Sequence, residues 1–169
     1  LTAQEKYLAK FGGHPMACGF SIATEADLQE FITSLRAAAA ESLAGQELLP
    51  LLRIEAELPW EDLNLVLAEK LKQLEPYGQD NPQPKFVSYN VLVSDLIFLG
   101  QENQHLKLRL TTAAKPHYLW GLAFNSALSY PDLAIGDKID IVYTLEVNEF
   151  NSRREAQLKI IDLRPSSKN

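Results

Sequence analysis

Apolar residues recur at two different spacings along this chain, and helical spacing dominates the first part. From Thr24 onward the apolar positions fit one face of an α-helix, with Thr24 as the N-cap and Gly45 as the stop: Leu28, Phe31, Ile32, Leu35 and Leu43. A second helical pattern runs from about Leu63 to Glu75 and ends at Pro76. We therefore predict two amphipathic helices before the proline-rich stretch at residues 76–84.

Alternation with a period of two dominates the rest of the chain. It predicts strands at about residues 86–99, 105–112, 118–124, 138–149 and 154–164. Residues 125–135 leave room for a short helix between the third and fourth strands, and this layout is typical of an OB-fold barrel. An SH3-like barrel and a sandwich fragment are the alternatives. Shorter strand patterns at Phe11–Ile22 and Leu52–Leu58 come before the barrel.

These patterns together predict an α+β protein. We expect a strand–helix element over residues 1–46, then a strand, a helix and a proline-rich connector over residues 47–84. A five-stranded OB-fold-like barrel then occupies residues 85–165, and residues 166–169 form a tail.

The alternation within strands predicts which side chains face outward. In the second barrel strand three leucines fall on the core side, which makes the opposite face cationic, with His105, Lys107, Arg109 and Thr111. In the third strand the aromatic side (Tyr118, Trp120, Leu122 and Phe124) is predicted to face the core, so Trp120 is a poor stacking platform. The fourth strand is predicted to direct Asp140, Thr144, Glu146 and Asn148 outward, where its acids would repel phosphate.

The turn between the last two strands, residues 148–154, combines an aromatic ring with two arginines. Phe150 could stack on a base while Arg153 and Arg154 meet phosphates, as in proteins that bind single strands. The alternative is a solvated hairpin tip.

Composition narrows the class of protein. The 169 residues are 46% hydrophobic and 22% charged, which is typical of a globular protein, and no apolar run approaches the length of a membrane-spanning helix. One cysteine and three histidines cannot form an internal disulfide or a structural zinc site, which favours a reducing cytoplasm. The chain starts without Met or an apolar leader, so we expect it to be a piece of a longer protein.

The net charge of −6 is unevenly distributed. Residues 1–84 hold 6 Lys and Arg against 13 Asp and Glu, whereas residues 85–164 hold 9 of each. Nucleic-acid binding through bulk charge is therefore not indicated, and any such binding must use a local basic patch.

Three short features in the first 62 residues contain side chains that could take part in binding or catalysis. Gly12, Gly13 and His14 could hold a phosphate or carboxylate through backbone N–H groups and an imidazole, although a tight turn with a satisfied histidine is the alternative. Cys18 is predicted to be a small buried residue. The acidic residues Glu55, Glu57, Glu61 and Asp62 are predicted to form a solvated face rather than a metal site.

Several motifs, in order, resemble one family. Residues 11–21, followed by a helix, resemble the end of the DHH-associated domain of DHH phosphoesterases. The stretch Leu74-Glu-Pro-Tyr-Gly-Gln-Asp-Asn-Pro-Gln-Pro84 resembles the L-x-P-[FY]-G-x-x-N-P-x-P element of the bacterial RecJ exonucleases. Residues 105–108, 136–140, 148–150 and 157–160 resemble strands of the RecJ OB-fold, so the similarity covers about residues 7–164.

The resemblance implies a parent enzyme that degrades single-stranded DNA from 5' to 3' in DNA repair and recombination. Its Mn or Mg would be held by Asp and His residues of a DHH domain whose motifs this sequence lacks, so we expect a C-terminal fragment that has no cofactor and is inactive alone. Gly12, Gly13 and His14 would seat the substrate phosphate, and Lys107, Arg109, Phe150, Arg153 and Arg154 would bind the strand. The implied partners are single-stranded DNA and other repair proteins, without a membrane.

Two other functions remain open at this point. The barrel could be a protein-docking or domain-bracing module, which its balanced charge favours. The parent could also be another DHH phosphoesterase that acts on short oligonucleotides or cyclic dinucleotides.

Overall fold

The computed structural model describes residues 2–14, 17–47, 49–113 and 115–166, and the chain divides into two compact units, Leu1–Leu51 and Leu52–Asn169. Pro15 and Met16, within the first resemblance motif, and Ser167–Asn169, within the expected tail, lie outside the described residues. Among the helices that the structure describes, none is both long and apolar enough to cross a membrane.

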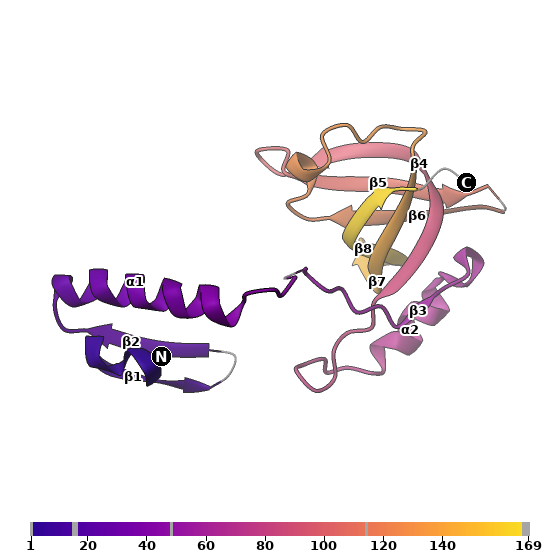
Figure 1. Ribbon diagram of the computed structural model, residues 1–169. Coiled ribbons are helices and arrows are strands. Elements are labelled where there is room, and N and C mark those ends of the chain that lie inside the picture. Colours follow the sequence, from indigo (N-terminus) through magenta and orange to yellow (C-terminus); the bar gives the residue numbers. More distant parts are fainter. Residues whose placement is uncertain (1, 15–16, 48, 114, 167–169) are drawn as a thin grey trace. The chain divides into compact units, whose positions relative to one another are not determined.

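The first unit is a β-hairpin followed by a long helix (Figure 1). A 3₁₀ helix, η1 (Thr2–Tyr7), leads into the antiparallel strands β1 (Leu8–His14) and β2 (Ala17–Ile22), and α1 spans Glu25–Ser42. The Thr24 hydroxyl accepts a hydrogen bond from the Asp27 N–H at 3.2 Å, which confirms the predicted N-cap. Phe31 of α1 is buried against Phe20 of β2, with 4.9 Å between the ring centroids.

Cys18 is exposed on β2, so the prediction that it is buried was wrong. Within the described part of this unit, β2 pairs with β1 and its residues from Ala17 to Ser21 are all exposed. An apolar strand pattern does not guarantee burial when the sheet is a two-stranded hairpin.

The second unit is a closed barrel (Figure 1). Its strands are β4 (Phe86–Leu99), β5 (His105–Thr112), β6 (Lys115–Ala123), β7 (Lys138–Phe150) and β8 (Arg153–Pro165). They follow the order β4-β5-β6-β8-β7, and β7 pairs back onto β4, so five strands close within the described residues. The α+β class and the OB-fold layout are therefore confirmed.

The barrel core contains the three leucines of β5 that were predicted to face inward, together with residues of the other four strands. Leu106, Leu108 and Leu110 are fully buried, and so are Ile141 and Tyr143. Burial raises the pKa of Tyr143 to about 12, and its hydroxyl lies 2.9 Å from that of Ser88. Thr111, predicted to face outward, is buried instead because the β5–β6 register shifts between Leu110 and Thr112.

Helical segments cover the two ends of the barrel (Figure 1). At one end, η2 (Trp60–Asp62) and α2 (Leu65–Lys72) pack beneath the core, and the buried Trp60 indole donates a 2.8 Å hydrogen bond to the His117 carbonyl. At the other end, η3 (Ala127–Ser129) forms the short helical turn predicted between the third and fourth strands. The helix α2 is shorter than the predicted helix, which ran from about Leu63 to Glu75. Leu74, assigned to that helix by the sequence pattern, lies beyond the end of α2 and is exposed.

The predicted strand at Leu52–Leu58 is almost absent. Only β3 (Ala56–Glu57) forms, in parallel with Phe86–Val87, and both of its residues are exposed. The proline-rich connector that follows α2 is held by its own side chains: Asn81 Nδ2 donates to the carbonyls of Leu74 and Pro76 at 2.8 and 3.0 Å.

Candidate nucleic-acid interface

The aromatic side chains of β6 face outward, which is the reverse of the prediction. Leu119, Gly121 and Ala123 point into the barrel and are buried, whereas Tyr118 and Phe124 are 46% and 52% exposed. A Cβ at Gly121 would lie only 2.7 Å from Ile160 Cδ1, so the barrel interior has no room for large side chains at this level of β6. Trp120, which is half-buried, therefore lies on the outer side of the barrel wall and not in the core.

The cations of β5 lie over the rings of β6. Lys107 Nζ is 4.7 Å from the centroid of the Trp120 ring, and the Arg109 guanidinium carbon is 4.3 Å from the centroid of Tyr118. Arg109 is directly opposite Trp120 in the strand register, so each cation reaches diagonally to a ring. Such cation–π contacts hold the charge and the ring together at the surface.

A third pair continues the same surface toward the end of β6. The His105 and Phe124 rings meet edge to face at 5.3 Å, and His105 Nδ1 accepts a hydrogen bond from the Asn125 N–H at 2.9 Å. We call the six side chains of this surface the β5–β6 ladder: His105, Lys107, Arg109, Tyr118, Trp120 and Phe124.

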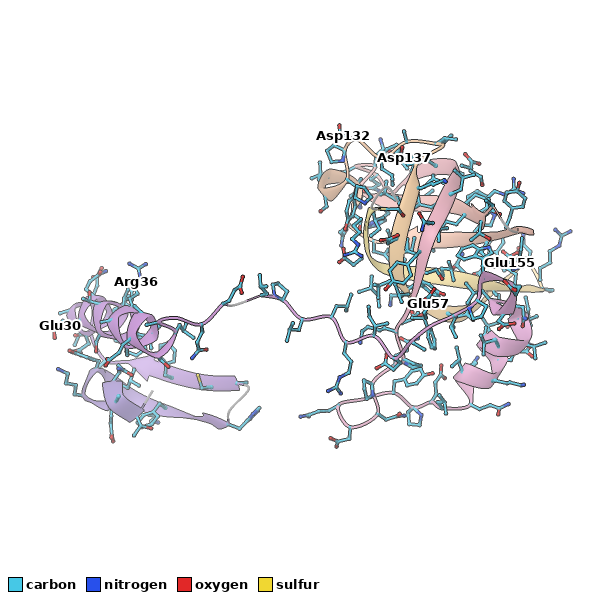
Figure 2. All side chains as sticks on the ribbon, turned by 45° about the vertical axis from the view of Figure 1, so that its right-hand side comes forward. Glu30, Arg36, Glu57, Asp132, Asp137 and Glu155 are labelled. Carbon is cyan, nitrogen blue, oxygen red and sulfur yellow. The ribbon has the colours of Figure 1, made fainter. Side chains whose placement is uncertain are left out.

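The ladder is locally cationic although the chain is acidic. The sequences of β5 and β6 contain neither Asp nor Glu, and in the register of β4 Asp95 is the residue opposite Arg109. In Figure 2, Asp132 and Asp137 lie at the η3 end of the barrel, whereas Glu155 lies near α2. Exposed rings interleaved with cations are the combination that holds bases and phosphates in proteins that bind single strands.

The β7–β8 hairpin carries the remaining candidates. Its turn residues Asn151 and Ser152 have positive φ angles of 48° and 60°, and Phe150 beside them is 70% exposed. Arg153, paired with Phe150 in the register, is also exposed. Arg154 is engaged within the protein: its Nη1 lies 2.9 Å from Glu69 Oε1 of α2.

Two of the residues predicted to face outward from β7 are buried, so that prediction was wrong for them. Asp140 is 8% exposed and Thr144 is 4% exposed. Burial alone would raise the pKa of Asp140, but hydrogen bonds from Ser166 and the Asn90 N–H, together with Arg164, outweigh it and hold that pKa below its usual range. The Asp140 charge is thus compensated locally and is not presented to a phosphate.

Gly12, Gly13 and His14 lie at the end of β1, in the first unit. Gly13 has a φ of +155°, and a Cβ there would meet the Ala17 carbonyl oxygen and lie 2.6 Å from Cys18 Cα, so only glycine fits. Gly12 and His14 are exposed on either side of it. The hairpin geometry itself thus explains why a glycine stands at position 13.

The described residues do not fit a divalent-metal site. No three His, Cys, Asp or Glu side chains gather within the part of the chain that the structure describes. Glu55, Glu57, Glu61 and Asp62 are exposed, as predicted.

Comparison with known proteins places these features in a family. The family model described as "RecJ OB domain" matches residues 54–162. The single-stranded-DNA-specific exonuclease RecJ of Bacillus subtilis is 28% identical over 155 residues, and that of Haemophilus influenzae is 34% identical over 161 residues. The crystal structure of Thermus thermophilus RecJ in complex with Mn²⁺ superposes with a TM-score of 0.75 at 27% identity.

The match covers nearly all of this chain but a small part of each relative. It spans 92% and 94% of this chain against 19% and 27% of the two exonucleases. For the Thermus structure it spans 99% of this chain and 23% of that one.

Proposed function

The chain belongs to the RecJ OB domain family, and on that basis we propose that it is the single-stranded-DNA-binding region of a RecJ-type exonuclease. The observation that carries this proposal is the β5–β6 ladder, a row of cations and exposed rings on the outer face of an OB-fold barrel. The face formed by these two strands is the one with which OB-folds commonly bind oligonucleotides.

The ladder would bind a strand by exchanging partners. Bases stack on Tyr118 and Trp120, and the cations that lie over these rings, Lys107 and Arg109, turn to the phosphates. Stacking and charge do not read base edges, so binding should not require a particular base sequence. A duplex keeps its bases paired and stacked inside, so it should bind less well.

The tip of the β7–β8 hairpin would add DNA contacts beyond the β5–β6 ladder. Phe150 offers a further exposed ring, with Arg153 paired to it across the turn. Arg154 can contact a phosphate only by giving up its carboxylate partners, Glu69 at 2.9 Å and Glu149 at 3.8 Å.

We further propose that Gly12, Gly13 and His14 seat a DNA phosphate when this chain is part of its parent exonuclease. The exposed glycine backbone allows close approach, and the His14 imidazole at the end of β1 could donate to a phosphate oxygen. Divalent metal, with which the Thermus RecJ was solved, would be held by other parts of the parent, and the 5'-to-3' hydrolysis used in repair would occur there.

Fluorescence anisotropy with a labelled single strand tests the proposal. Affinity should fall steeply with salt, and charge reversal at Lys107 or Arg109 should weaken binding and flatten the salt dependence, by roughly 0.7 in the log–log slope for each phosphate that is no longer neutralised. Lys138→Glu, an exposed lysine at the start of β7, is the matched control and should change little. Failure of the unaltered chain to bind any single strand would instead favour a docking module.

A further inference from the structure

We propose that the β5–β6 ladder selects single strands whose bases are unstacked, and therefore prefers weakly stacking pyrimidine strands to strongly stacking purine strands. The inference rests on the proposed function, because it concerns how the same surface would hold DNA. It adds a substrate preference that follows from the spacing of the rings.

The spacing of Tyr118 and Trp120 sets the distance between neighbouring bases. They are two residues apart on one strand and both face outward, which places them roughly 6.6 Å apart at a rise of 3.3 Å per residue. Stacked bases follow one another at roughly 3.4 Å. Two adjacent bases cannot lie on these two rings and remain stacked on each other.

The cations of β5 repeat with the same period. Lys107 and Arg109 are also two residues apart and both reach the ring surface, at 4.7 and 4.3 Å from the ring centroids. Cations displaced from the rings would therefore meet phosphates spaced by roughly 6.6 Å. This period equals that of the rings, so one cation accompanies each ring along the surface.

Other sources of base preference are scarce on this surface. The sequences of β5 and β6 contain no Asn, Gln, Asp or Glu, which are side chains commonly used to read adenine and cytosine edges. Discrimination would then come from the cost of opening the stack, which is greater for adenine runs than for thymine runs. An abasic strand has no stacked bases to separate, but it also has no bases that could stack on Tyr118 and Trp120.

The test compares three labelled oligonucleotides of equal length by anisotropy with the whole chain: oligo-dT, oligo-dA and an abasic strand. Oligo-dT should bind about fivefold or more tightly than oligo-dA, with the abasic strand weaker than oligo-dT. Warming should narrow the difference between oligo-dT and oligo-dA, because heat unstacks the adenines.

Ring variants then locate the effect on the ladder. Tyr118→Leu and Trp120→Leu should bring the dT-to-dA ratio close to one, mainly by weakening oligo-dT. Tyr89→Leu removes another exposed tyrosine, 44% accessible on β4, and should leave the ratio unchanged. Circular dichroism melting verifies folding, and the temperature dependence of the unaltered chain tests the idea even if a variant does not fold.

Two results would overturn the inference, and they are distinguishable. If oligo-dA binds as tightly as oligo-dT while ladder variants still weaken both, the preference is refuted and the proposed DNA-binding function stands. If no strand binds at low salt, the proposed function fails and the preference fails with it.

Discussion

At the scale of single residues, Gly121 decides where the rings of β6 can lie. Its inward position leaves space for Ile160 and Leu110, whose side-chain carbons would lie 2.7 and 3.4 Å from an added Cβ. Because the interior is filled at this level, the large side chains of β6 occupy the outer surface. The glycine at position 121 thus fits the inward face of β6, and the aromatic residues on either side of it fit the outward face.

Asp140 makes the free energy of unfolding depend on pH in the acidic range. Its pKa is lowered in the folded chain, so its contribution to stability is present above its ordinary pKa, near pH 4, and is lost as the pH falls through the folded value. Asp140→Asn should cost about 1–3 kcal/mol at pH 7, because a charged acceptor of three hydrogen bonds is replaced by a neutral one. Urea unfolding at pH 7 and pH 3 measures both effects.

Comparing the two pH values separates the effect of the Asp140 charge from other effects of the substitution. The cost of Asp140→Asn should be smaller at pH 3, below the ordinary pKa of aspartate, because the carboxyl is then largely protonated in the unfolded chain and must lose its proton to form the folded-state contacts. Asp132→Asn, at an exposed position before β7, is the control and should behave like the unaltered chain. An equal cost at both pH values would contradict the linkage.

His14 should affect chemistry and not folding. It is exposed at the end of β1, so His14→Ala should change the free energy of unfolding by no more than about 0.5 kcal/mol. In the full-length parent it should lower exonuclease turnover by about ten- to a hundredfold, the value of a hydrogen bond to a charged group. Steady-state kinetics and urea unfolding are the two measurements.

Lys10→Ala, on the same strand, is the control for His14. It removes an exposed cation before the Gly-Gly-His sequence and should leave turnover near normal. A large loss of stability with normal turnover for His14→Ala would show that the histidine is structural.

At the scale of elements, the β7–β8 hairpin is braced from one side by α2. The Arg154–Glu69 pair joins them, but both side chains are about half exposed, at 45% and 40%. An exposed ion pair of this kind contributes about 1 kcal/mol or less, so a phosphate can compete with Glu69 for Arg154.

Glu69→Gln should therefore strengthen single-strand binding. It removes the nearer of the two carboxylates paired with Arg154 and leaves Glu149 at 3.8 Å, so the dissociation constant should fall about two- to fivefold with a steeper salt dependence. Anisotropy titrations at two salt concentrations measure both quantities. Glu75→Gln, an exposed carboxylate after α2, controls for net charge. Weaker binding by Glu69→Gln would show that the pair positions the hairpin for DNA.

The elements themselves were largely predictable from sequence, and their faces only in part. The bounds of β4 and β5 agree with the patterns at residues 86–99 and 105–112, because alternation there is flanked by turn residues. On β6 both faces are apolar, so alternation could not say which one is inside, although the small residues Gly121 and Ala123 were a usable signal. The Arg154–Glu69 contact joins residues far apart in sequence, and no local pattern indicates it.

At the scale of the whole molecule, charge is segregated and not merely negative. The net charge is −6, yet β5 and β6 carry no carboxylate in their sequences; Asp95 of β4 is opposite Arg109 in the register, and Asp132 and Asp137 lie at the η3 end of the barrel (Figure 2). The equal numbers of acidic and basic residues over residues 85–164 do not show this local excess of positive charge on β5 and β6. Composition alone therefore favours a docking module, and the arrangement of side chains favours a grip on nucleic acid.

The same whole-molecule view predicts that this chain alone hydrolyses no DNA in Mn²⁺ or Mg²⁺. Metal-assisted phosphodiester cleavage needs several carboxylate or imidazole ligands around one ion, and the described residues gather no three His, Cys, Asp or Glu. Incubation of the purified chain with a 5'-labelled single strand should release no nucleotides above a heat-treated sample, while anisotropy on the same preparation shows whether the strand is bound. Chelator-sensitive release that co-purifies with the chain, and that Lys107→Glu reduces, would refute the prediction and place a complete active site within these residues.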